Sequence, residues 1–194
     1  LSNPVSTRPF PDPAKYELLV VMGSTWSVND QRIESWIERE IEMVKTAHDS
    51  GVKVLGICFG GQVLSKALGG NVESASRPEI GWHEVKANNP DSPINGLWFQ
   101  WHYDKFSVPD GAEELARSET CTQAFSMGSS LGIQFHPEVS STQLAKWVMI
   151  SKEELTKNNL DGTKLLDDTK INEVEASVRS ESLLDWHLAD LMKT

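Results

Sequence analysis

The stretch VLGICFGGQ, residues 54–62, is an apolar run that ends on a cysteine and then breaks into glycines. The run is typical of a buried strand, and apolar residues at helical spacing resume directly after it. Cys58 therefore lies at a turn from strand to helix. Two interpretations are open. A free cysteine is usually a small buried apolar residue, but a cysteine on such a turn can also be a nucleophile.

The segments around this stretch predict an α/β fold. Apolar runs at 16–23 and 52–57 indicate buried strands, and three- and four-residue spacing at 30–51 and 60–70 indicates amphipathic helices. A strand-helix-strand-helix order implies parallel strands with helices on both faces of the sheet.

The middle of the chain has a different pattern. Shorter alternating runs at 71–88 and 96–109 indicate antiparallel strands at one side of the sheet. A hairpin that turns at Gly128 leads to a last strand at 131–135, and a helix begins within 140–151. We expect an open, mostly parallel sheet flanked by helices, of the flavodoxin-like type, with a small antiparallel portion.

The tail, residues 151–194, is acidic and helical in pattern. We expect a domain over residues 1–150 and a helical extension over 151–194 that packs on the same domain. The apolar residues predicted to dock this extension are Ile171, Val174, Val178, Leu183, Leu184, Trp186, Leu188 and Leu191.

Composition excludes several classes of protein. The 194 residues are 39% hydrophobic and 24% charged, which is ordinary for a globular domain. The formal net charge of -10 argues against general affinity for nucleic acid or for anionic membranes. No apolar run approaches the roughly 20 residues that span a bilayer, and no signal peptide is visible. Two cysteines form no disulfide framework, so a reducing cytoplasm is the expected location.

The position of Cys58 suits a nucleophile. The turn places its side chain at the carboxyl edge of the sheet, where open α/β folds bind ligands. The N-terminus of the following helix carries partial positive charge and free N–H groups, which favour a thiolate and can hold a developing oxyanion. On this evidence alone, a structural cysteine remains the commoner outcome.

A thiolate nucleophile also needs a base and a group that orients the base. The segment IQFHPEV supplies both, because His136 follows a predicted strand and Glu138 stands two residues further on. If that strand is parallel to 52–57, His136 emerges at the same sheet edge as Cys58. By itself the segment could be a surface turn; together with Cys58 it favours catalysis.

The other histidines and the second cysteine suggest no second catalytic site. His48, His83 and His187 fit surface or packing roles, and Cys121 has no base motif nearby, so we expect an inert thiol. Because no set of His, Cys and acidic residues has metal-ligand spacing, we expect no metal site.

Together these residues resemble the class-I, triad-type glutamine amidotransferases. Gly56, Cys58, Gly60 and Gln62 match the family motif G-x-C-x-G-x-Q, and QFHPE matches the histidine motif. The segments PEIGWHEV and WHYDKFSVP are similar to those of stand-alone members near the glutaminase domain of GMP synthase. The resemblance covers about residues 10–150.

The resemblance implies residue roles. Cys58 would attack the side-chain amide of glutamine and form a γ-glutamyl thioester. His136 would take the thiol proton and pass it to the leaving ammonia, and Glu138 would orient His136. No cofactor is expected.

It also implies a binding site around these three residues. The backbone N–H groups of Phe59 and Gly23 would form the oxyanion hole. Gln62 and the backbone around Tyr103 and Asp104 would hold the glutamine.

The chain departs from the family pattern in three places. Ser24 follows Gly23 where many members have a second glycine, and Gly61 replaces a larger residue. Family domains also begin with one more strand and helix before residue 16. We expect that strand to lie beside the strand at 52–57, and hence the native chain to be longer.

The partner and the substrate are open at this stage. Members supply ammonia to a synthetase, and this chain has no phosphate-binding loop of its own. We therefore expect glutamine or a γ-glutamyl small molecule as substrate, and a possible partner is an ammonia-accepting synthetase subunit. The alternatives are a γ-glutamyl hydrolase or peptidase with the same triad, and a non-catalytic amidotransferase-like subunit.

Overall fold

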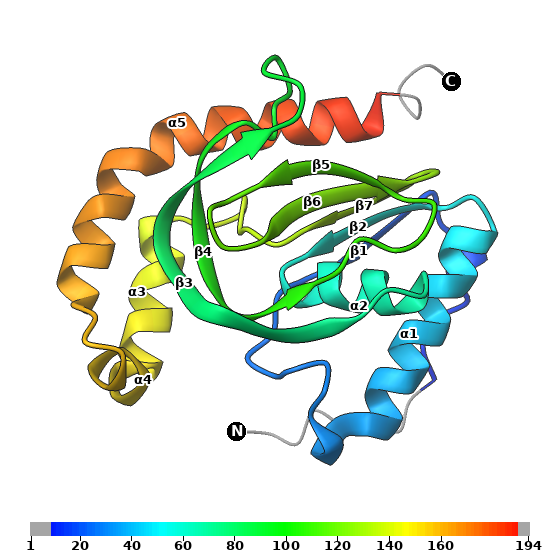
Figure 1. The fold of residues 1–194 in the computed structure, drawn as a ribbon, viewed down its shortest axis with the longest axis horizontal. Coiled ribbons are helices and arrows are strands. Elements are labelled where there is room, and N and C mark those ends of the chain that lie inside the picture. Colours follow the sequence, from blue (N-terminus) through cyan, green and yellow to red (C-terminus); the bar gives the residue numbers. More distant parts are fainter. Residues whose placement is uncertain (1–8, 190–194) are drawn as a thin grey trace.

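The computed structural model describes residues 9–189, in which helices surround one curled sheet (Figure 1). Short 3-10 helices cover Pro13–Lys15 and Gln31–Ile33. The other elements in chain order are β1 (Leu18–Val21), α1 (Glu34–Asp49), β2 (Lys53–Ile57), α2 (Phe59–Ala67), β3 (Val72–Ala87), β4 (Gly96–Phe106), β5 (Glu113–Arg117), β6 (Thr122–Met127), β7 (Ser130–Ile133), α3 (Ser141–Ile150), α4 (Lys152–Lys157) and α5 (Gly162–Leu188).

The sheet has seven strands in the order β1-β2-β7-β6-β5-β3-β4. The α/β class is confirmed, as are the parallel strands with helices on their faces and the antiparallel strands at one side. The predicted extent of the parallel part is wrong. Only β1–β2 and β2–β7 pair in parallel, and the other four pairings are antiparallel. The antiparallel part is larger because β3 and β4 form one long ribbon and β5 adds a strand that the sequence pattern did not indicate.

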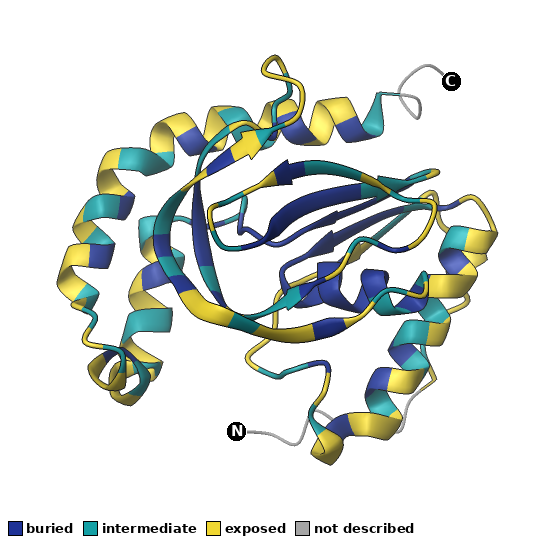
Figure 2. Ribbon diagram, viewed as in Figure 1, coloured by how far each residue is buried: buried dark blue, intermediate teal, exposed yellow. Residues whose placement is uncertain are grey.

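Strand β2 is buried on both faces because helices cover it from both sides. Successive residues of a strand point to opposite faces. Val54 packs in one cluster with Val44 of α1 and Leu64 of α2. Leu55 packs in the opposite cluster, which includes Leu183 of α5. Figure 2 shows the buried residues concentrated in the strands between these helices.

A third cluster fills the space between the β3–β4 ribbon and helices α3, α4 and α5. Phe99 of β4, Leu144 of α3, Leu155 of α4 and Leu165 of α5 are all buried there. Figure 1 shows α3 and α4 beside the curled ribbon. This cluster fixes the C-terminal helices next to the carboxyl edge of β2.

The predicted docking face of α5 is largely wrong. Ile171, Val174 and Val178 are more than 60% exposed, and Leu184 and Trp186 are also exposed. Leu183 is buried as predicted and Leu188 is half-buried; Leu191 lies outside the described residues.

The helix docks through polar as well as apolar contacts, and an apolar pattern cannot identify the former. Trp82 Nε1 donates to Thr169 Oγ1 at 2.9 Å, and an Arg179 guanidinium nitrogen donates to the Leu97 carbonyl at 2.7 Å. The division into a domain at 1–150 and an extension at 151–194 stays a prediction.

The expected place of a further strand beside β2 is also wrong. β2 has hydrogen-bonded neighbours on both sides, β1 and β7, so no gap exists there. β1 is instead the edge strand of the described sheet. Among residues 9–189, no helix combines the length and apolar character that crossing a membrane requires.

Candidate active site

Cys58 stands on a strained turn between β2 and α2. Its backbone has φ 51° and ψ -106°, a region that residues with a side chain rarely adopt. Two hydrogen bonds hold this conformation. The Cys58 N–H donates to the Ile133 carbonyl at 2.8 Å, and the Gln62 N–H donates to the Cys58 carbonyl at 3.0 Å. Such strain persists only where the surrounding structure imposes it, and it is common at functional sites.

The glycines after Cys58 allow the first turn of α2 to lie against the sheet. A Cβ atom at Gly60 would collide with the Val21 carbonyl of β1, and a Cβ atom at Gly61 would collide with the Ile133 carbonyl of β7. The glycines thus let backbone pack on backbone here. Gly61, a departure from the family pattern, is required by this contact in the present chain.

His136 and Glu138 follow β7, which runs parallel to β2. Both strands therefore deliver their next residues to the same edge of the sheet, as predicted. The backbone N–H of His136 donates to the Phe99 carbonyl at 2.8 Å. The ring atom His136 Nδ1 lies 2.8 Å from Glu138 Oε1. The ring also packs against Trp147 of α3, with centroids 5.2 Å apart. These contacts fix the orientation of the imidazole.

The charge state of His136 depends on its two neighbours. Burial acts against the imidazolium, but the charge and hydrogen bond of Cys58, and then those of Glu138, raise the pKa of His136 to about 10. His136 is therefore protonated at neutral pH in this arrangement. A protonated imidazole next to a cysteine favours the thiolate form of that cysteine.

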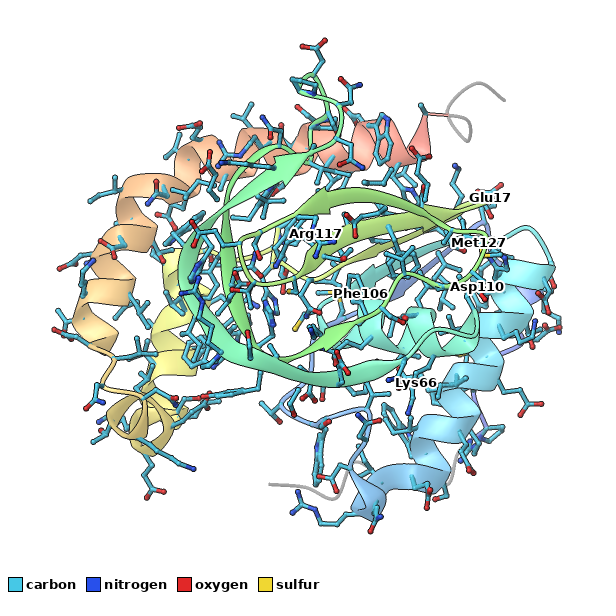
Figure 3. The ribbon with its side chains drawn as sticks, viewed as in Figure 1. Glu17, Lys66, Phe106, Asp110, Arg117 and Met127 are labelled. Carbon is cyan, nitrogen blue, oxygen red and sulfur yellow. The ribbon has the colours of Figure 1, made fainter. Side chains whose placement is uncertain are left out.

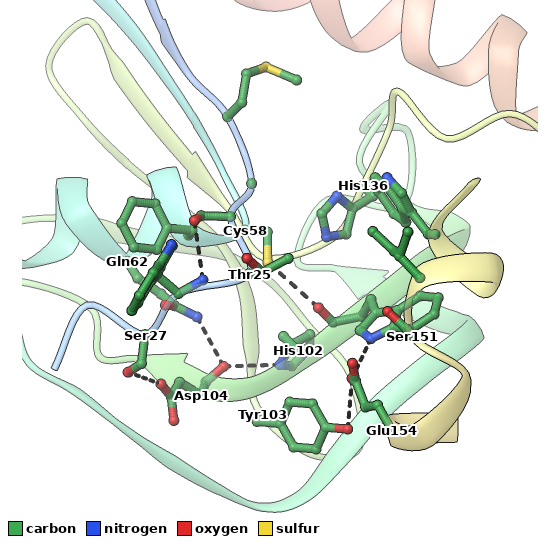
Figure 4. Close-up of a pocket in the computed structure, with 18 of the residues that line it drawn as sticks. Thr25, Ser27, Cys58, Gln62, His102, Tyr103, Asp104, His136, Ser151 and Glu154 are labelled. Carbon is green, nitrogen blue, oxygen red and sulfur yellow. Dashed lines mark hydrogen bonds between the residues drawn. The ribbon is translucent and has the colours of Figure 1, made fainter. Parts of the chain in front are cut away.

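All eight predicted site residues line one cleft, which has a volume of about 500 Å³. They are Gly23, Cys58, Phe59, Gln62, Tyr103, Asp104, His136 and Glu138. Figure 4 shows several of them around the Cys58 thiol.

The two residues predicted for the oxyanion hole lie beside the nucleophile. Phe59 is the first residue of α2, where a backbone N–H has no partner within the helix. Gly23 follows β1, and a Cβ atom there would lie 2.8 Å from His136 Cε1 and 3.8 Å from Cys58 Cβ. This placement is compatible with the predicted role, which stays a prediction.

Two of the residues predicted to bind substrate, Gln62 and Asp104, are joined by a hydrogen bond. Gln62 Nε2 donates to the Asp104 carbonyl at 3.2 Å, and His102 Nδ1 lies 3.0 Å from the same oxygen (Figure 4). The Ser27 hydroxyl donates to Asp104 Oδ2 at 2.6 Å. Gln62 therefore holds the Asp104 backbone in place, and its predicted contact with substrate stays untested.

The sequence reasoning missed one wall of the cleft. Glu154 of α4 accepts hydrogen bonds at Oε1 from Trp101 Nε1 at 2.7 Å and from the Tyr103 hydroxyl at 2.9 Å. Trp101, Trp147 and Glu154 all line the cleft. Glu154 belongs to no motif and lies in the segment predicted as an extension, so no signal in the sequence pointed to it.

Cys121, His48, His83 and His187 lie outside the cleft, whereas His102 lines it. Cys121 is buried, and burial, followed by the charge of Glu79, raises the pKa of its thiol to about 12, which fits the predicted inert thiol. His102 reaches the cleft on one side and Glu79 on the other. Glu79, His102 and Cys121 form the one group of possible metal ligands among the described residues.

The fold and the cleft together define an α/β protein that presents a cysteine on a strained strand-to-helix turn beside a histidine–glutamate pair. The family model for "Glutamine amidotransferase class-I" matches residues 5–152. The chain belongs to the class-I glutamine amidotransferase family.

Solved structures of similar fold support this assignment. A glutamine amidotransferase from Thermotoga maritima superposes with a TM-score of 0.82 at 28% identity, over 97% of this chain and 81% of that one. A glutamine amidotransferase from Methylobacillus flagellatus superposes with a TM-score of 0.79 at 28% identity, over 94% of this chain and 78% of the other.

Curated relatives of this chain include GMP synthases. The enzyme of Pectobacterium atrosepticum is 34% identical over 113 residues, which cover 49% of this chain and 21% of that protein. A GMP synthase subunit of Sulfurisphaera tokodaii is 38% identical over 98 residues, which cover 46% of this chain and 52% of that relative. The aligned part of the chain thus spans about a fifth of the first relative and about half of the second.

Proposed function

We propose that this protein hydrolyses the side-chain amide of glutamine through a γ-glutamyl thioester on Cys58 and releases ammonia. The observation that carries the proposal is the strained Cys58 in one cleft with the hydrogen-bonded pair of His136 and Glu138. Membership of the class-I glutamine amidotransferase family supports the choice of glutamine.

The geometry supports the following reaction steps, in which atoms and charges balance. The Cys58 thiolate attacks the amide carbon, and the N–H groups of Phe59 and Gly23 stabilise the oxyanion that forms. His136 donates its proton to the departing nitrogen, which leaves as ammonia. Water then attacks the thioester, its proton passes to His136, and glutamate leaves as the thiolate returns.

Glu138 acts by holding the imidazole, since its carboxylate accepts from Nδ1 and leaves Nε2 for the reaction. We assign substrate binding to Gln62, Tyr103 and Asp104. In this assignment the cleft presents the acidic Asp104 to the α-ammonium group of the substrate.

The acceptor of the ammonia is proposed to be a synthetase on another chain. The Sulfurisphaera tokodaii relative is named as one subunit of a GMP synthase, which indicates that a glutaminase and its synthetase can be separate chains.

A second candidate is a γ-glutamyl hydrolase or peptidase. The cleft of about 500 Å³ falls in the range of sites that enclose drug-sized ligands, and glutamine is much smaller. The space extends past His136 to an aromatic wall of Trp101 and Trp147. A leaving group larger than ammonia could pack against that wall.

The test compares glutamine with a γ-glutamyl dipeptide as substrates of the purified protein. The leading proposal predicts release of ammonia from glutamine, abolished by Cys58→Ser and kept by Cys121→Ser, which removes the other thiol. Turnover of the dipeptide without turnover of glutamine would favour the second candidate instead.

A thiol-reactive glutamine analogue tests the non-catalytic alternative. The analogue should label the wild-type protein and Cys121→Ser once per chain and leave Cys58→Ser unlabelled. Absence of labelling at Cys58 would contradict both enzymatic proposals.

A further inference from the structure

Three side chains with metal-binding atoms meet beside the β3–β4 ribbon, and two of them, Glu79 and Cys121, lie outside the cleft. Glu79 comes from β3, His102 from β4, and Cys121 directly precedes β6. All three are buried, and one ligand atom of each lies within 4.8 Å of the others. Residues from three strands therefore offer an oxygen, a nitrogen and a sulfur atom to one point.

The orientation of His102 leaves one nitrogen aimed into this group. Nδ1 lies 3.0 Å from the Asp104 carbonyl, a contact that fixes the proton on Nδ1. Metal-bound histidines in proteins commonly donate their other ring N–H to a carbonyl in this way. His102 Nε2 is buried and faces Glu79 Oε2 at 3.2 Å, an ion-pair contact that falls short of good hydrogen-bond geometry.

Two of the three spacings between these atoms suit a tetrahedral zinc site, and all three lie within 4.8 Å. Zinc binds nitrogen and oxygen at about 2.0–2.2 Å and sulfur at about 2.3 Å, so neighbouring ligand atoms lie roughly 3.2–3.8 Å apart. The Glu79 Oε2 atom lies 3.2 Å from His102 Nε2 and 3.7 Å from Cys121 Sγ. We propose that Glu79, His102 and Cys121 bind a zinc ion.

The surroundings suit a bound cation. Glu79 Oε2 also accepts hydrogen bonds from Ser118 Oγ at 3.1 Å and from Gln123 Nε2 at 2.9 Å, and these contacts hold the carboxylate in place. Binding would replace the proton on the Cys121 sulfur by the metal and release it to solvent. The two anionic ligands then balance the charge of Zn²⁺.

A second cavity adjoins the group at Cys121. It has a volume of about 260 Å³. Figure 3 labels two other residues of its border, Phe106 of β4 and Arg117 of β5. A water molecule entering from this cavity can supply the fourth ligand that a zinc site requires.

A metal bound here would affect the cleft by holding His102 and the Asp104 backbone in position. His102 contacts the Asp104 carbonyl, which also accepts from Gln62. Zinc on His102 Nε2 would tie β3, β4 and the start of β6 together and hold that carbonyl next to the cleft. Glu79 and Cys121 line no part of the cleft, so the zinc has no direct part in the chemistry proposed for Cys58.

The experiment uses Cys58→Ser, because Cys58 and His136 could themselves capture a metal. The sequence contains two cysteines, so Cys121 is then the only thiol. Zn²⁺ should bind with one ion per chain by equilibrium dialysis and elemental analysis. Co²⁺ should bind at the same place and produce a thiolate-to-cobalt absorption band in the near ultraviolet.

The matched variant is Cys58→Ser combined with Cys121→Ser. We expect zinc binding to weaken at least roughly 100-fold and the cobalt band to vanish, because a ligand matters more than the outer partners of a metal site. The metal-free fold should be unchanged by circular dichroism. If the double variant does not fold, the cobalt band of Cys58→Ser still shows whether the Cys121 thiolate binds the metal.

Two results would overturn the proposal. Absence of stoichiometric zinc binding by Cys58→Ser would mean that Glu79 and His102 form a closed ion pair without metal. Cobalt binding without a thiolate band would place the ion elsewhere. Neither result bears on glutamine hydrolysis, so the proposed function is tested separately.

Discussion

At the scale of single residues, the backbone conformation of Cys58 determines what the site can do. The positive φ is held by hydrogen bonds to two neighbouring segments, and the Cys58 side chain, although only 5% exposed, lines the cleft. His136 is then held between Cys58 and Glu138, and both favour its charged form.

The pH dependence of activity tests this arrangement at Glu138. The pKa of His136 is raised to about 10, so the imidazolium form persists through neutral pH and is lost as the pH rises through about 10. Glu138→Gln removes one cause of the shift. We expect the alkaline decline of kcat/KM to move to lower pH and kcat to fall by roughly 10²-fold.

A pH profile of kcat/KM for both proteins measures this change. Glu119→Gln, which alters a side chain that is 91% exposed, serves as the control and should leave the profile unchanged. An unshifted alkaline limb in Glu138→Gln would mean that Glu138 does not set the charge state of His136.

At the scale of elements, α5 shows why an apolar pattern alone misidentifies a docking face. Ile171, Val174 and Val178 have helical spacing, yet all three are exposed. Thr169 and Arg179 contact the β3–β4 ribbon by hydrogen bonds. The curved surface that α5 follows determines which residues touch it, and that surface exists only in the folded protein.

Two adjacent leucines of α5 provide a matched comparison. Leu183 is 1% exposed and packs against the face of the sheet opposite α1 and α2, whereas Leu184 is 41% exposed. Leu183→Ala should lower the free energy of unfolding by about 2–5 kcal/mol because it leaves a cavity. Leu184→Ala should lower it by less than about 1 kcal/mol.

Chemical denaturation of both variants, with unfolding followed by circular dichroism, gives the two free energies. Equal decreases in the free energy of unfolding for Leu183→Ala and Leu184→Ala would contradict the placement of α5 on the sheet.

At the scale of the whole molecule, the cleft is assembled from segments that lie far apart in the sequence, three of which show this most clearly. The turn at Cys58 supplies the thiol, the β3–β4 ribbon supplies Trp101 to Asp104, and α3 and α4 supply Trp147 and Glu154. The wall made by α4 stands in a segment that the sequence suggests is an extension, so that segment contributes to the site.

Glu154→Ala should raise KM with a smaller effect on kcat. Hydrogen bonds to a charged group are worth about 1.5–3 kcal/mol each, and Trp101 and Tyr103 would both lose theirs. We expect KM to rise roughly tenfold or more, which corresponds to about 1.4 kcal/mol. Steady-state kinetics with glutamine and with a γ-glutamyl dipeptide measure the change.

The neighbouring exposed residue provides the control, since Glu153→Ala alters the same helix outside the cleft. A KM unchanged in Glu154→Ala would exclude this wall from substrate binding. A change in KM for the dipeptide alone would indicate that this wall contacts the leaving group of the substrate.

The sequence by itself determined the α/β class and the parallel strands that carry the site, and it predicted Cys58, His136 and Glu138 as the candidate catalytic residues. It could do so because these features are local. A buried strand, a glycine-rich turn and a histidine two residues from a glutamate each occupy a few consecutive positions, and parallel strands bring their carboxyl ends to one edge.

Only the tertiary structure decided the extent of the antiparallel ribbon, the docking face of α5, the wall at Glu154 and the meeting of Glu79, His102 and Cys121. These depend on contacts between residues far apart in the chain, such as the 53 positions between Trp101 and Glu154. No spacing along the sequence encodes them, because the curl of the sheet sets which side chains come together.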